Sequence, residues 1–217
     1  MPETCGKPFE LLPAPAQVVL PMSMHIGAPA KPVVKPGDEV KVGQLIAEPG
    51  GFMSSPIYAS VSGRVQKIDE VLQLNGSNCQ AIVIESDGEQ ALYEGIAAPE
   101  VNDFNSFIEA VKNSGVVGLG GAGFPTAVKL NVDPAKVDYI CVNGAECEPY
   151  ITADTRTMLD NTQYIVDGIR LLQKYLQRKT VFIGIEKNKP QCIAKLREFT
   201  KGMDGVTVAE LPSLYPQ

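Results

Sequence analysis

The spacing of turn signals changes near residue 93, and this change constrains the fold more than any other feature of the sequence. Between residues 24 and 85, short β-prone runs alternate with turn signals such as Pro36-Gly37-Asp38, Pro49-Gly50-Gly51 and Asn75-Gly76. Many short strands with frequent turns predict a compact β sandwich or barrel. After Tyr93 the turn signals thin out and longer segments alternate between helix and strand patterns, which predicts βαβ units and a mostly parallel sheet.

These patterns divide the 217 residues into an extended lead-in at residues 1–17, a β module at 18–92 and an α/β domain at 93–217. In the β module we expect strands at residues 18–20, 31–34, 44–48, 63–68 and 80–85. In the α/β domain we expect helices at residues 102–113, 126–130 and 190–200, a long helical region at 154–178, and strands at 137–143, 180–186 and 206–211. Because the chain stops shortly after an interior-looking strand, we expect it to be part of a longer protein.

Composition and charge exclude several function classes. The net charge is −6 and no basic patch with interleaved aromatic residues occurs, so nucleic acid is not an expected partner. No apolar run approaches the roughly 20 residues of a membrane helix, and the N-terminus lacks the pattern of a signal peptide. We therefore expect a cytoplasmic protein, or one bound peripherally to that side of a membrane.

The five cysteines and the single histidine give no support for a metal centre. No CxxC pair occurs, and Cys141 and Cys147 are six positions apart, which favours free thiols over metal ligands. His25 lies among small and apolar residues, so a packed, hydrogen-bonded histidine is favoured over a catalytic one. We expect neither a metal site nor a catalytic side chain.

The segment from Gly118 to Lys129 is the first candidate site, because it begins with four glycines in six residues. Glycines let the backbone turn tightly and let a ligand approach the main chain. Successive free N–H groups in such a turn, with a helix start behind them, are typical of phosphate binding. The segment does not match GxxxxGK[ST], so a plain tight connection stays an alternative.

A second candidate segment lies at the end of the strand expected at residues 137–143. Asn143, Glu146 and Glu148 lie just past the carboxyl end of that strand, where ligands of parallel sheets bind. The acidic side chains have a simpler interpretation as surface charges. In the same way Lys129 can be a solvated helix residue, and Phe124 can be a core residue. The two segments together, rather than any single residue, indicate a functional site.

The β module also has a resemblance of its own. Residues 34–48, followed by residues 59–65, resemble the barrel-sandwich hybrid of biotinyl and lipoyl carrier domains. Such carriers present a modifiable lysine at a hairpin tip. The matching segment here, residues 49–56, contains no lysine, so a covalent carrier is not expected and a docking or structural module is favoured.

Two long motifs in the same order support a wider resemblance. Residues 118–129 together with residues 142–154, VNGAECEPYITAD, resemble the RnfC family, a component of Rnf electron-transport complexes. Residues 24–34, MHIGAPAKPVV, are similar to the same family, and the resemblance covers nearly all of residues 10–217. The second module is more distantly similar to the FMN- and NADH-binding subunit of respiratory complex I.

The resemblance implies an α+β chain of two modules. A barrel-sandwich hybrid would be followed by a Rossmann-like α/β FMN-binding domain with a mostly parallel sheet. The residues it assigns to an FMN and NADH site are Gly118, Gly120, Gly121, Phe124, Lys129, Asn143, Glu146 and Glu148. The three glycines and Lys129 would bind FMN, and Phe124 would lie near the nicotinamide. Asn143 and Glu146 would face the flavin, and Glu148 would contact the dinucleotide.

The chain departs from the complex I relative at three positions. Leu119 stands where that relative has an arginine, Ala145 where it has an aspartate and Cys147 where it has a glycine. The first two differences remove charge from the candidate segments. No CxxCxxCxxxCP run occurs, so the two [4Fe–4S] clusters common in RnfC proteins are expected only in a C-terminal part of the longer protein, beyond these residues.

The resemblance therefore implies a subunit that accepts hydride from NADH on bound FMN and passes electrons to iron–sulfur clusters. The expected partners are NADH and the other subunits of an ion-translocating NADH:ferredoxin oxidoreductase complex, on the inner face of the cell membrane. Two alternatives stay open: a docking subunit with a degenerate flavin site, and an RnfC-like electron donor to a soluble reductase. The chain alone is expected to be inactive.

Overall fold

The computed structural model describes residues 7–146 and 148–214. The chain separates into two compact units, which are described one at a time. The β-rich unit comprises residues 12–131, and the α/β unit is built from residue 132 onward. Contacts alone do not define a domain, so the boundary expected between residues 92 and 93 stays a prediction.

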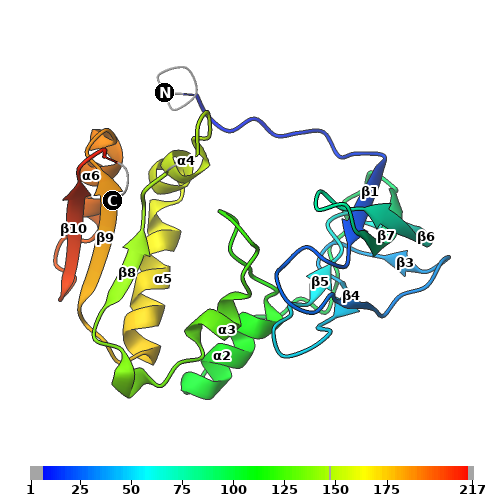
Figure 1. Cartoon of the computed structure of the whole chain (residues 1–217), viewed down its shortest axis with the longest axis horizontal. Coiled ribbons are helices and arrows are strands. Elements are labelled where there is room, and N and C mark those ends of the chain that lie inside the picture. Colours follow the sequence, from blue (N-terminus) through cyan, green and yellow to red (C-terminus); the bar gives the residue numbers. More distant parts are fainter. Residues whose placement is uncertain (1–6, 147, 215–217) are drawn as a thin grey trace. The chain divides into compact units, whose positions relative to one another are not determined.

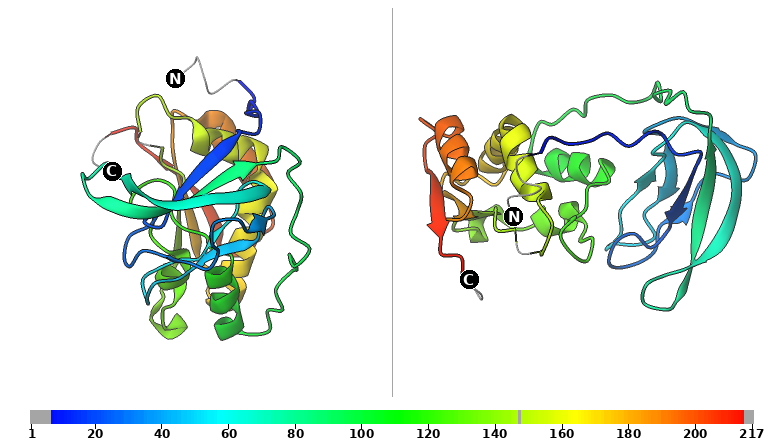
Figure 2. Two further views of the ribbon diagram at one scale, coloured as in Figure 1. Left: turned by 90° about the vertical axis from the view of Figure 1, so that its right-hand side faces the viewer. Right: turned by 90° about the horizontal axis from the view of Figure 1, so that it is seen from above.

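The β-rich unit contains two antiparallel sheets (Figure 1). The first has the order β1-β7-β6-β3, and its strands are β1 (Gln17–Pro21), β7 (Asn78–Ser86), β6 (Gly63–Leu72) and β3 (Glu39–Val40). The second has the order β2-β4-β5, and its strands are β2 (Lys31–Pro32), β4 (Leu45–Glu48) and β5 (Ile57–Tyr58). The β6–β7 hairpin is longer than the strands beside it and is strongly curled (Figure 2).

One hydrophobic core joins these two sheets, as expected of a sandwich. Ile46, Ala47 and Ile57 come from the smaller sheet, while Ile82 and Ile84 come from the larger one. The remaining fully packed members are Met22, Ala30, Val40, Ala59, Val61 and Val65. This arrangement confirms the barrel-sandwich hybrid expected for the β module.

Two helices complete the β-rich unit, α2 (Phe104–Asn113) and α3 (Thr126–Leu130). A capping box fixes the start of α2: the Asp103 carboxylate accepts from the Ser106 N–H at 2.7 Å, and the Ser106 hydroxyl oxygen accepts from the Asp103 N–H at 2.9 Å. Phe107 is buried on the inner face of α2. The two helices were expected at these positions, with the start of α2 two residues earlier.

The α/β unit contains a parallel sheet of order β10-β9-β8, made from β8 (Ile140–Asn143), β9 (Val181–Glu186) and β10 (Val206–Leu211). A short 3₁₀ helix (Pro134–Lys136) precedes β8. The connections contain α4 (Ala153–Asp160), α5 (Thr162–Tyr175) and α6 (Pro190–Phe199). These helices lie on one side of the sheet (Figure 2, right). Buried Val181, Ile183 and Ile185 alternate with less buried residues along β9, so the buried face is one face of the sheet.

The long helical region expected at residues 154–178 is present, but the structure divides it into two helices, α4 and α5. Asn161 adopts φ −119° and ψ 27°, outside the helical region, between α4 and α5. The Thr162 hydroxyl donates to the Met158 carbonyl, which the helix backbone would otherwise use. The strand expected at residues 31–34 spans only Lys31–Pro32, and β3 and β5 were not expected.

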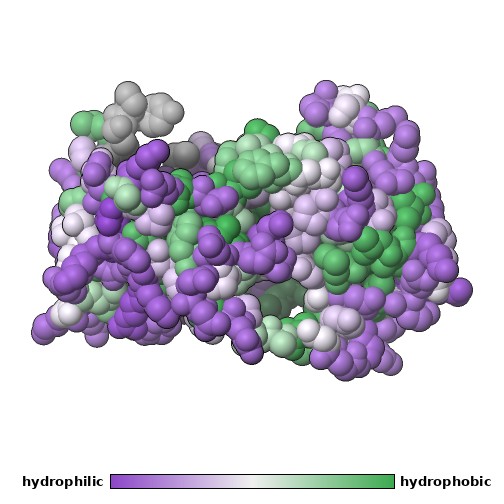
Figure 3. Space-filling model, turned by 90° about the horizontal axis from the view of Figure 1, so that it is seen from below, coloured by the Kyte–Doolittle hydropathy of each residue, from purple (hydrophilic) through white to green (hydrophobic). Residues whose placement is uncertain are grey.

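The fold class is thus the expected one: a barrel-sandwich hybrid followed by an α/β segment with a parallel sheet. In the described part of the chain, no helix combines the length and apolar character that crossing a membrane requires. Figure 3 shows one face of the surface, on which hydrophilic residues predominate and apolar residues form scattered patches.

Candidate functional site

The glycine-rich segment forms an exposed loop of the β-rich unit. An isolated antiparallel bridge pairs Val117 with Pro125 and closes the loop, and the Gly118 N–H donates to the Phe124 carbonyl at 2.9 Å. Between these points, the backbone N–H groups of residues 119–122 make no hydrogen bond to any described residue. Because an amide without an internal partner must face water or a ligand, the loop offers several donors to an anion.

Glycine is required at position 123 by both conformation and space. Gly123 has φ +64°, in the left-handed region, and a Cβ there would lie 2.8 Å from the Met24 carbonyl oxygen. The Ile26 N–H donates to the Ala122 carbonyl at 3.0 Å beside this contact. The end of the loop is therefore seated on the segment Met24–Ile26 of the same unit.

A pocket of about 440 Å³ lies between the loop and this segment. Its lining residues are Ser23, Met24, His25, Ile26, Val117, Gly118, Leu119, Gly121, Ala122 and Gly123. Gly118 and Gly121 are thus brought together at one pocket. Gly120 is exposed beside it, whereas Phe124 is half-buried and Lys129 is exposed on α3, and neither lines the pocket.

Lys129 makes no side-chain hydrogen bond or ion pair with any described residue. The spacing of Gly118, Gly120 and Gly123 fits G-x-G-x-x-G. However, the segment follows α2 rather than a strand of a parallel sheet, so it is not a dinucleotide fingerprint. The five-residue helix α3 is too short to add much of a helix dipole, so the loop amides and Lys129 carry the positive character.

His25 is packed and hydrogen-bonded, as expected, and it joins two loops of the β-rich unit. The residue is only 6% exposed. Its Nε2 atom accepts from the Ser55 N–H at 3.1 Å, so in the neutral ring Nδ1 carries the proton and lies 3.2 Å from the Ile26 carbonyl oxygen. Ser54 and Ser55 are buried beside it. Within residues 49–56, where carrier domains present a lysine, the second half is therefore packed against His25, whereas Gly51 and Phe52 are exposed.

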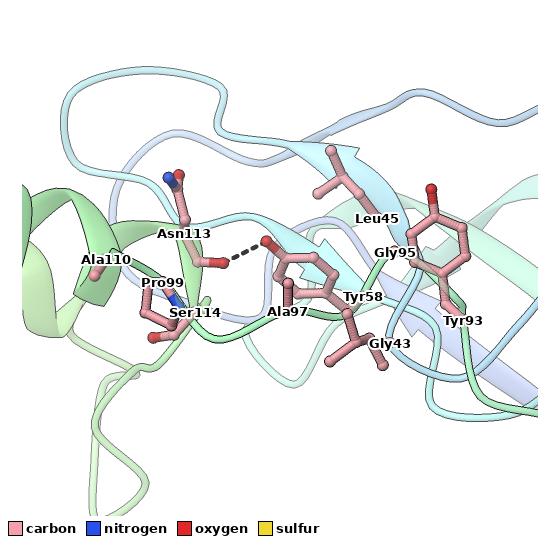
Figure 4. A pocket seen from close by; sticks show the side chains of 11 residues that line it. Gly43, Leu45, Tyr58, Tyr93, Gly95, Ala97, Pro99, Ala110, Asn113 and Ser114 are labelled. Atoms are coloured by element: carbon pink, nitrogen blue, oxygen red, sulfur yellow. Dashed lines mark hydrogen bonds between the residues drawn. The ribbon is translucent and has the colours of Figure 1, made fainter. Parts of the chain in front are cut away.

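Another pocket of the β-rich unit, of about 450 Å³, contains none of the expected site residues (Figure 4). It lies between β4, β5 and the segment that precedes α2, and Tyr93, Ile96 and Pro99 line one part of it. The Tyr58 hydroxyl donates to the Asn113 carbonyl at its edge. Burial raises the pKa of Tyr58, so this hydroxyl stays protonated at neutral pH.

In the α/β unit, the acidic turn (residues 143–148) follows the carboxyl end of β8. The Asn143 side-chain oxygen accepts from the Ala145 N–H at 3.0 Å, and the Gly144 N–H donates to the Gly184 carbonyl of β9 at 2.8 Å. A Cβ on Gly144 would lie 2.9 Å from that carbonyl oxygen, so only glycine fits this close approach. Asn143 itself is exposed at the carboxyl edge of the sheet, the edge at which parallel sheets generally bind ligands. Cys147 lies outside the described residues.

Glu146 has a buried carboxylate, with its side chain only 1% exposed. One oxygen accepts from the N–H groups of Asp154 at 2.7 Å and Thr155 at 3.2 Å, at the start of α4. The other accepts from the Thr155 hydroxyl at 2.6 Å and from the Lys189 ammonium. Burial alone would raise the pKa of Glu146, but the hydrogen bonds from Lys189 and Thr155 outweigh it and hold the pKa below its ordinary value.

Glu148 differs from Glu146 because it is exposed and its side chain makes no hydrogen bond or ion pair with a described residue. Nearby, burial and then the Glu146 carboxylate raise the pKa of Asp154. Tyr150 has φ +66° and is largely exposed, so the chain just after the turn includes one residue in the left-handed region. The acidic turn therefore offers Asn143 and Glu148 to solvent and keeps Glu146 inside.

The glycine-rich loop of the β-rich unit fits an anionic group such as the phosphate of FMN. An added Cβ at Gly120 or Gly121 would meet nothing within 4 Å, so a phosphate can reach the bare main chain. Lys129, in the same unit as the loop, is exposed and positively charged. In the α/β unit, described by itself, Glu148 presents an exposed carboxylate that can accept hydrogen bonds. Among the described residues, no group of three or more His, Cys, Asp or Glu side chains could hold a metal ion.

Comparison with known families gives two domains in the order that the fold shows. Residues 2–89 match the RnfC barrel sandwich hybrid domain, and residues 111–217 match the Nuo51 FMN-binding domain. The first match covers the sandwich of antiparallel sheets. The second covers the segment that includes both the glycine-rich loop and the parallel sheet.

Three curated proteins show the likeness along nearly the whole chain. The chain is 45% identical to the C subunit of the proton-translocating ferredoxin:NAD(+) oxidoreductase complex of Clostridium ljungdahlii, over 99% of this chain and 48% of that protein. It is 43% identical to the C subunit of the Na(+)-translocating ferredoxin:NAD(+) oxidoreductase complex of Acetobacterium woodii, over 94% of this chain and 47% of that protein. It is 40% identical to the C subunit of the ion-translocating oxidoreductase complex of Klebsiella pneumoniae, over 97% of this chain and 28% of that protein.

The fold and the candidate site thus define a barrel-sandwich hybrid linked to an FMN-binding domain. The chain belongs to the RnfC family. It spans about half the length of the first two relatives, and less of the third. Lys189 and Thr155 were not expected from the sequence, because nothing in their local pattern marks them as partners of Glu146.

Proposed function

We propose that this protein is an electron-transfer subunit that binds FMN and accepts hydride from NADH. The observation that carries the proposal is the glycine-rich loop, whose backbone N–H groups at residues 119–122 have no partner among the described residues. A dianionic phosphate is a ligand that suits several backbone amides without an internal acceptor, followed by an exposed lysine in the same segment. The relatives named as ferredoxin:NAD(+) oxidoreductase subunits support a redox role.

The proposal assigns each candidate residue a task. Gly118, Gly120 and Gly121 let the phosphate approach the main chain, and Lys129 neutralises its charge. Phe124 lies beside the nicotinamide when NADH binds. These residues belong to the β-rich unit.

The α/β unit contributes the polar contacts in this proposal. Asn143 and Glu148 hydrogen-bond to the flavin and to the hydroxyl groups of the dinucleotide, since both side chains are exposed at the end of β8. Glu146 belongs to the same turn, and its carboxylate keeps the turn attached to α4.

When bound, FMN supplies the two-electron chemistry that accepts hydride and the one-electron chemistry that passes electrons on singly. The chain needs no general base for this step. Its residues bind two anionic ligands and orient them, and Glu148 holds the hydroxyl groups that fix the nicotinamide ring in place. The electrons would then leave through iron–sulfur clusters in a C-terminal part of the longer protein.

We further propose that the partners are the other subunits of an Rnf-type complex. The three relatives are each named as a C subunit of an ion- or proton-translocating oxidoreductase complex, and the proposal transfers that assembly to this chain. The complex would hold this protein peripherally at the inner face of the cell membrane. One relative is named as a subunit of a proton-translocating complex and another as a subunit of a Na(+)-translocating complex. The proposal therefore names no coupling ion.

One observation favours a second function, a docking subunit without flavin. Leu119 replaces the arginine of the complex I relative, is 95% exposed and carries no charge toward a phosphate. A protein that used this surface only for docking would have no need for a cationic loop. Such a protein would bind no flavin, whereas the first proposal requires that it does.

The test reconstitutes the protein, in the longest form its gene encodes, with oxidised FMN under anaerobic conditions and without an added reductant. After removal of free FMN, bound flavin should retain its yellow absorbance, and NADH should bleach it. Retained flavin that NADH does not reduce would overturn the NADH step. Failure to retain any flavin would overturn the FMN site and favour the docking function.

A further inference from the structure

Glu146 has no acceptor capacity left for a ligand. A carboxylate has about four lone-pair positions. Four donors already point at it: the N–H groups of Asp154 and Thr155, the Thr155 hydroxyl and the Lys189 ammonium. A flavin or ribose hydroxyl could bind Glu146 only by displacing one of these donors from a side chain that is 1% exposed.

Glu146, Thr155 and Lys189 form a cluster in which each side chain hydrogen-bonds to the other two. The Thr155 hydroxyl donates to Glu146, and the Lys189 ammonium donates both to Glu146 and to the Thr155 hydroxyl oxygen, the latter at 2.6 Å. The Lys189 side chain is only 14% exposed. Because charge-assisted hydrogen bonds among buried groups are strong and directional, this cluster fixes the orientation of each member.

The cluster joins two connections at the edge of the sheet where ligands bind. Glu146 follows β8, and Lys189 follows β9 and immediately precedes α6. Asn143 and Gly184 are paired in the parallel register, so both connections leave the same edge. Thr155 belongs to α4, so the cluster also fixes the start of that helix.

We propose that Lys189 and Thr155 are positioning residues that hold Glu146, and through it the acidic turn, in the shape that presents Asn143 and Glu148 to the flavin. This inference rests on the proposed FMN function. It gives the two acidic residues different roles: Glu148 contacts the ligand, whereas Glu146 holds the turn in shape. It also identifies a residue 43 positions from Glu146 as part of the same site.

A purely structural ion pair is the competing explanation, because removing one partner of a buried pair destabilises most proteins. The two explanations differ in what a charge-free pair would do. If the ion pair only stabilises the fold, replacing both charges with neutral groups restores folding and FMN binding together. If it positions the turn, the refolded protein still binds FMN weakly.

The test compares Lys189→Met, Lys189→Arg, the double variant Glu146→Gln/Lys189→Met and the control Lys187→Met, whose side chain is exposed. Two quantities are measured for each: the dissociation constant for FMN, and the hydrogen-exchange rates of the Asp154 and Thr155 amides. Lys189→Met should weaken FMN binding and accelerate exchange, each by about tenfold or more. Lys189→Arg should retain most of both properties, and Lys187→Met should change neither.

The double variant should fold with a stability near that of the unmodified protein and still bind FMN about tenfold more weakly. FMN binding by the double variant that equals that of the unmodified protein would overturn the inference, as would unchanged amide exchange in Lys189→Met. If the unmodified protein binds no FMN, the proposed function fails by itself. The exchange rates then still decide whether Lys189 holds the acidic turn.

Discussion

The Nε2 atom of His25 accepts a hydrogen bond from the backbone N–H of Ser55 at 3.1 Å. This bond ties the hairpin tip of the barrel-sandwich hybrid to the segment on which the glycine-rich loop rests, because Gly123 packs against Met24 and His25. Part of the segment at which carrier domains present their lysine, residues 54–56, is here buried next to that support. The β module therefore positions the loop that is proposed to bind phosphate.

Replacing His25 with alanine should destabilise the protein by about 1–3 kcal/mol, because the buried Ser55 N–H loses its acceptor. The free energy of unfolding, measured by urea denaturation, provides the test. His25→Gln, whose amide oxygen can accept the same bond, should recover part of the loss. A His25→Ala variant as stable as the unmodified protein would show that the bond does not hold the tip.

Alanine at Gly123 should cost at least about 1–2 kcal/mol, because the residue has φ +64° and its Cβ would meet the Met24 carbonyl oxygen at 2.8 Å. Gly120→Ala is the matched control in the same loop, since a Cβ there meets nothing within 4 Å. Its effect on stability should stay within about 0.5 kcal/mol. Equal thermal unfolding midpoints for the two variants would contradict the seating of the loop.

The lowered pKa of Glu146 makes part of the stability dependent on pH. For a carboxyl group with a lowered folded-state pKa, the stabilisation is fully present above the ordinary value of 4.5 and is lost as the pH falls through the folded-state pKa. The stability gap between the unmodified protein and Glu146→Gln should therefore be largest near pH 7 and shrink below about pH 4.5. Urea denaturation across this range measures the gap, and a gap that stays constant down to pH 3 would be the contrary result.

Much of the fold could be predicted from the sequence, because local patterns set it. The strand at residues 206–211 and the helix at residues 126–130 have the expected bounds, and the turn-rich first part forms the expected sandwich. The break at Asn161 was missed, since an apolar helical period continues across it and only the Thr162 hydroxyl reveals the interruption. Very short strands such as β3 were missed for a similar reason, because two residues carry no period.

The candidate site could be predicted less completely. Glycine-rich loops and polar residues after a strand are local signals, and they located both segments. The partners of Glu146 are not local: Lys189 is 43 residues away, and the pairing depends on the register of two parallel strands. A sequence pattern therefore indicates that Glu146 matters, but not that its carboxylate is already saturated.

Glu148 should contribute to NADH use without contributing to stability. Because its exposed carboxylate makes no hydrogen bond or ion pair with a described residue, Glu148→Gln should leave the free energy of unfolding within about 0.5 kcal/mol. The same change should weaken NADH-dependent flavin reduction about tenfold or more, through loss of charged hydrogen bonds to ribose hydroxyls. The measurement is the NADH concentration for half-maximal reduction, with Glu100→Gln as control. An unchanged value would remove Glu148 from the site.

FMN binding at the glycine-rich loop is tested most directly by an equilibrium titration of the protein with FMN, followed by quenching of flavin fluorescence. We expect one FMN per chain, with a dissociation constant that rises about tenfold or more in Lys129→Ala. Lys35→Ala, which removes another exposed lysine of the β-rich unit, should leave the constant unchanged. Absence of FMN binding, or equal affinity in Lys129→Ala and the unmodified protein, would contradict the proposed site.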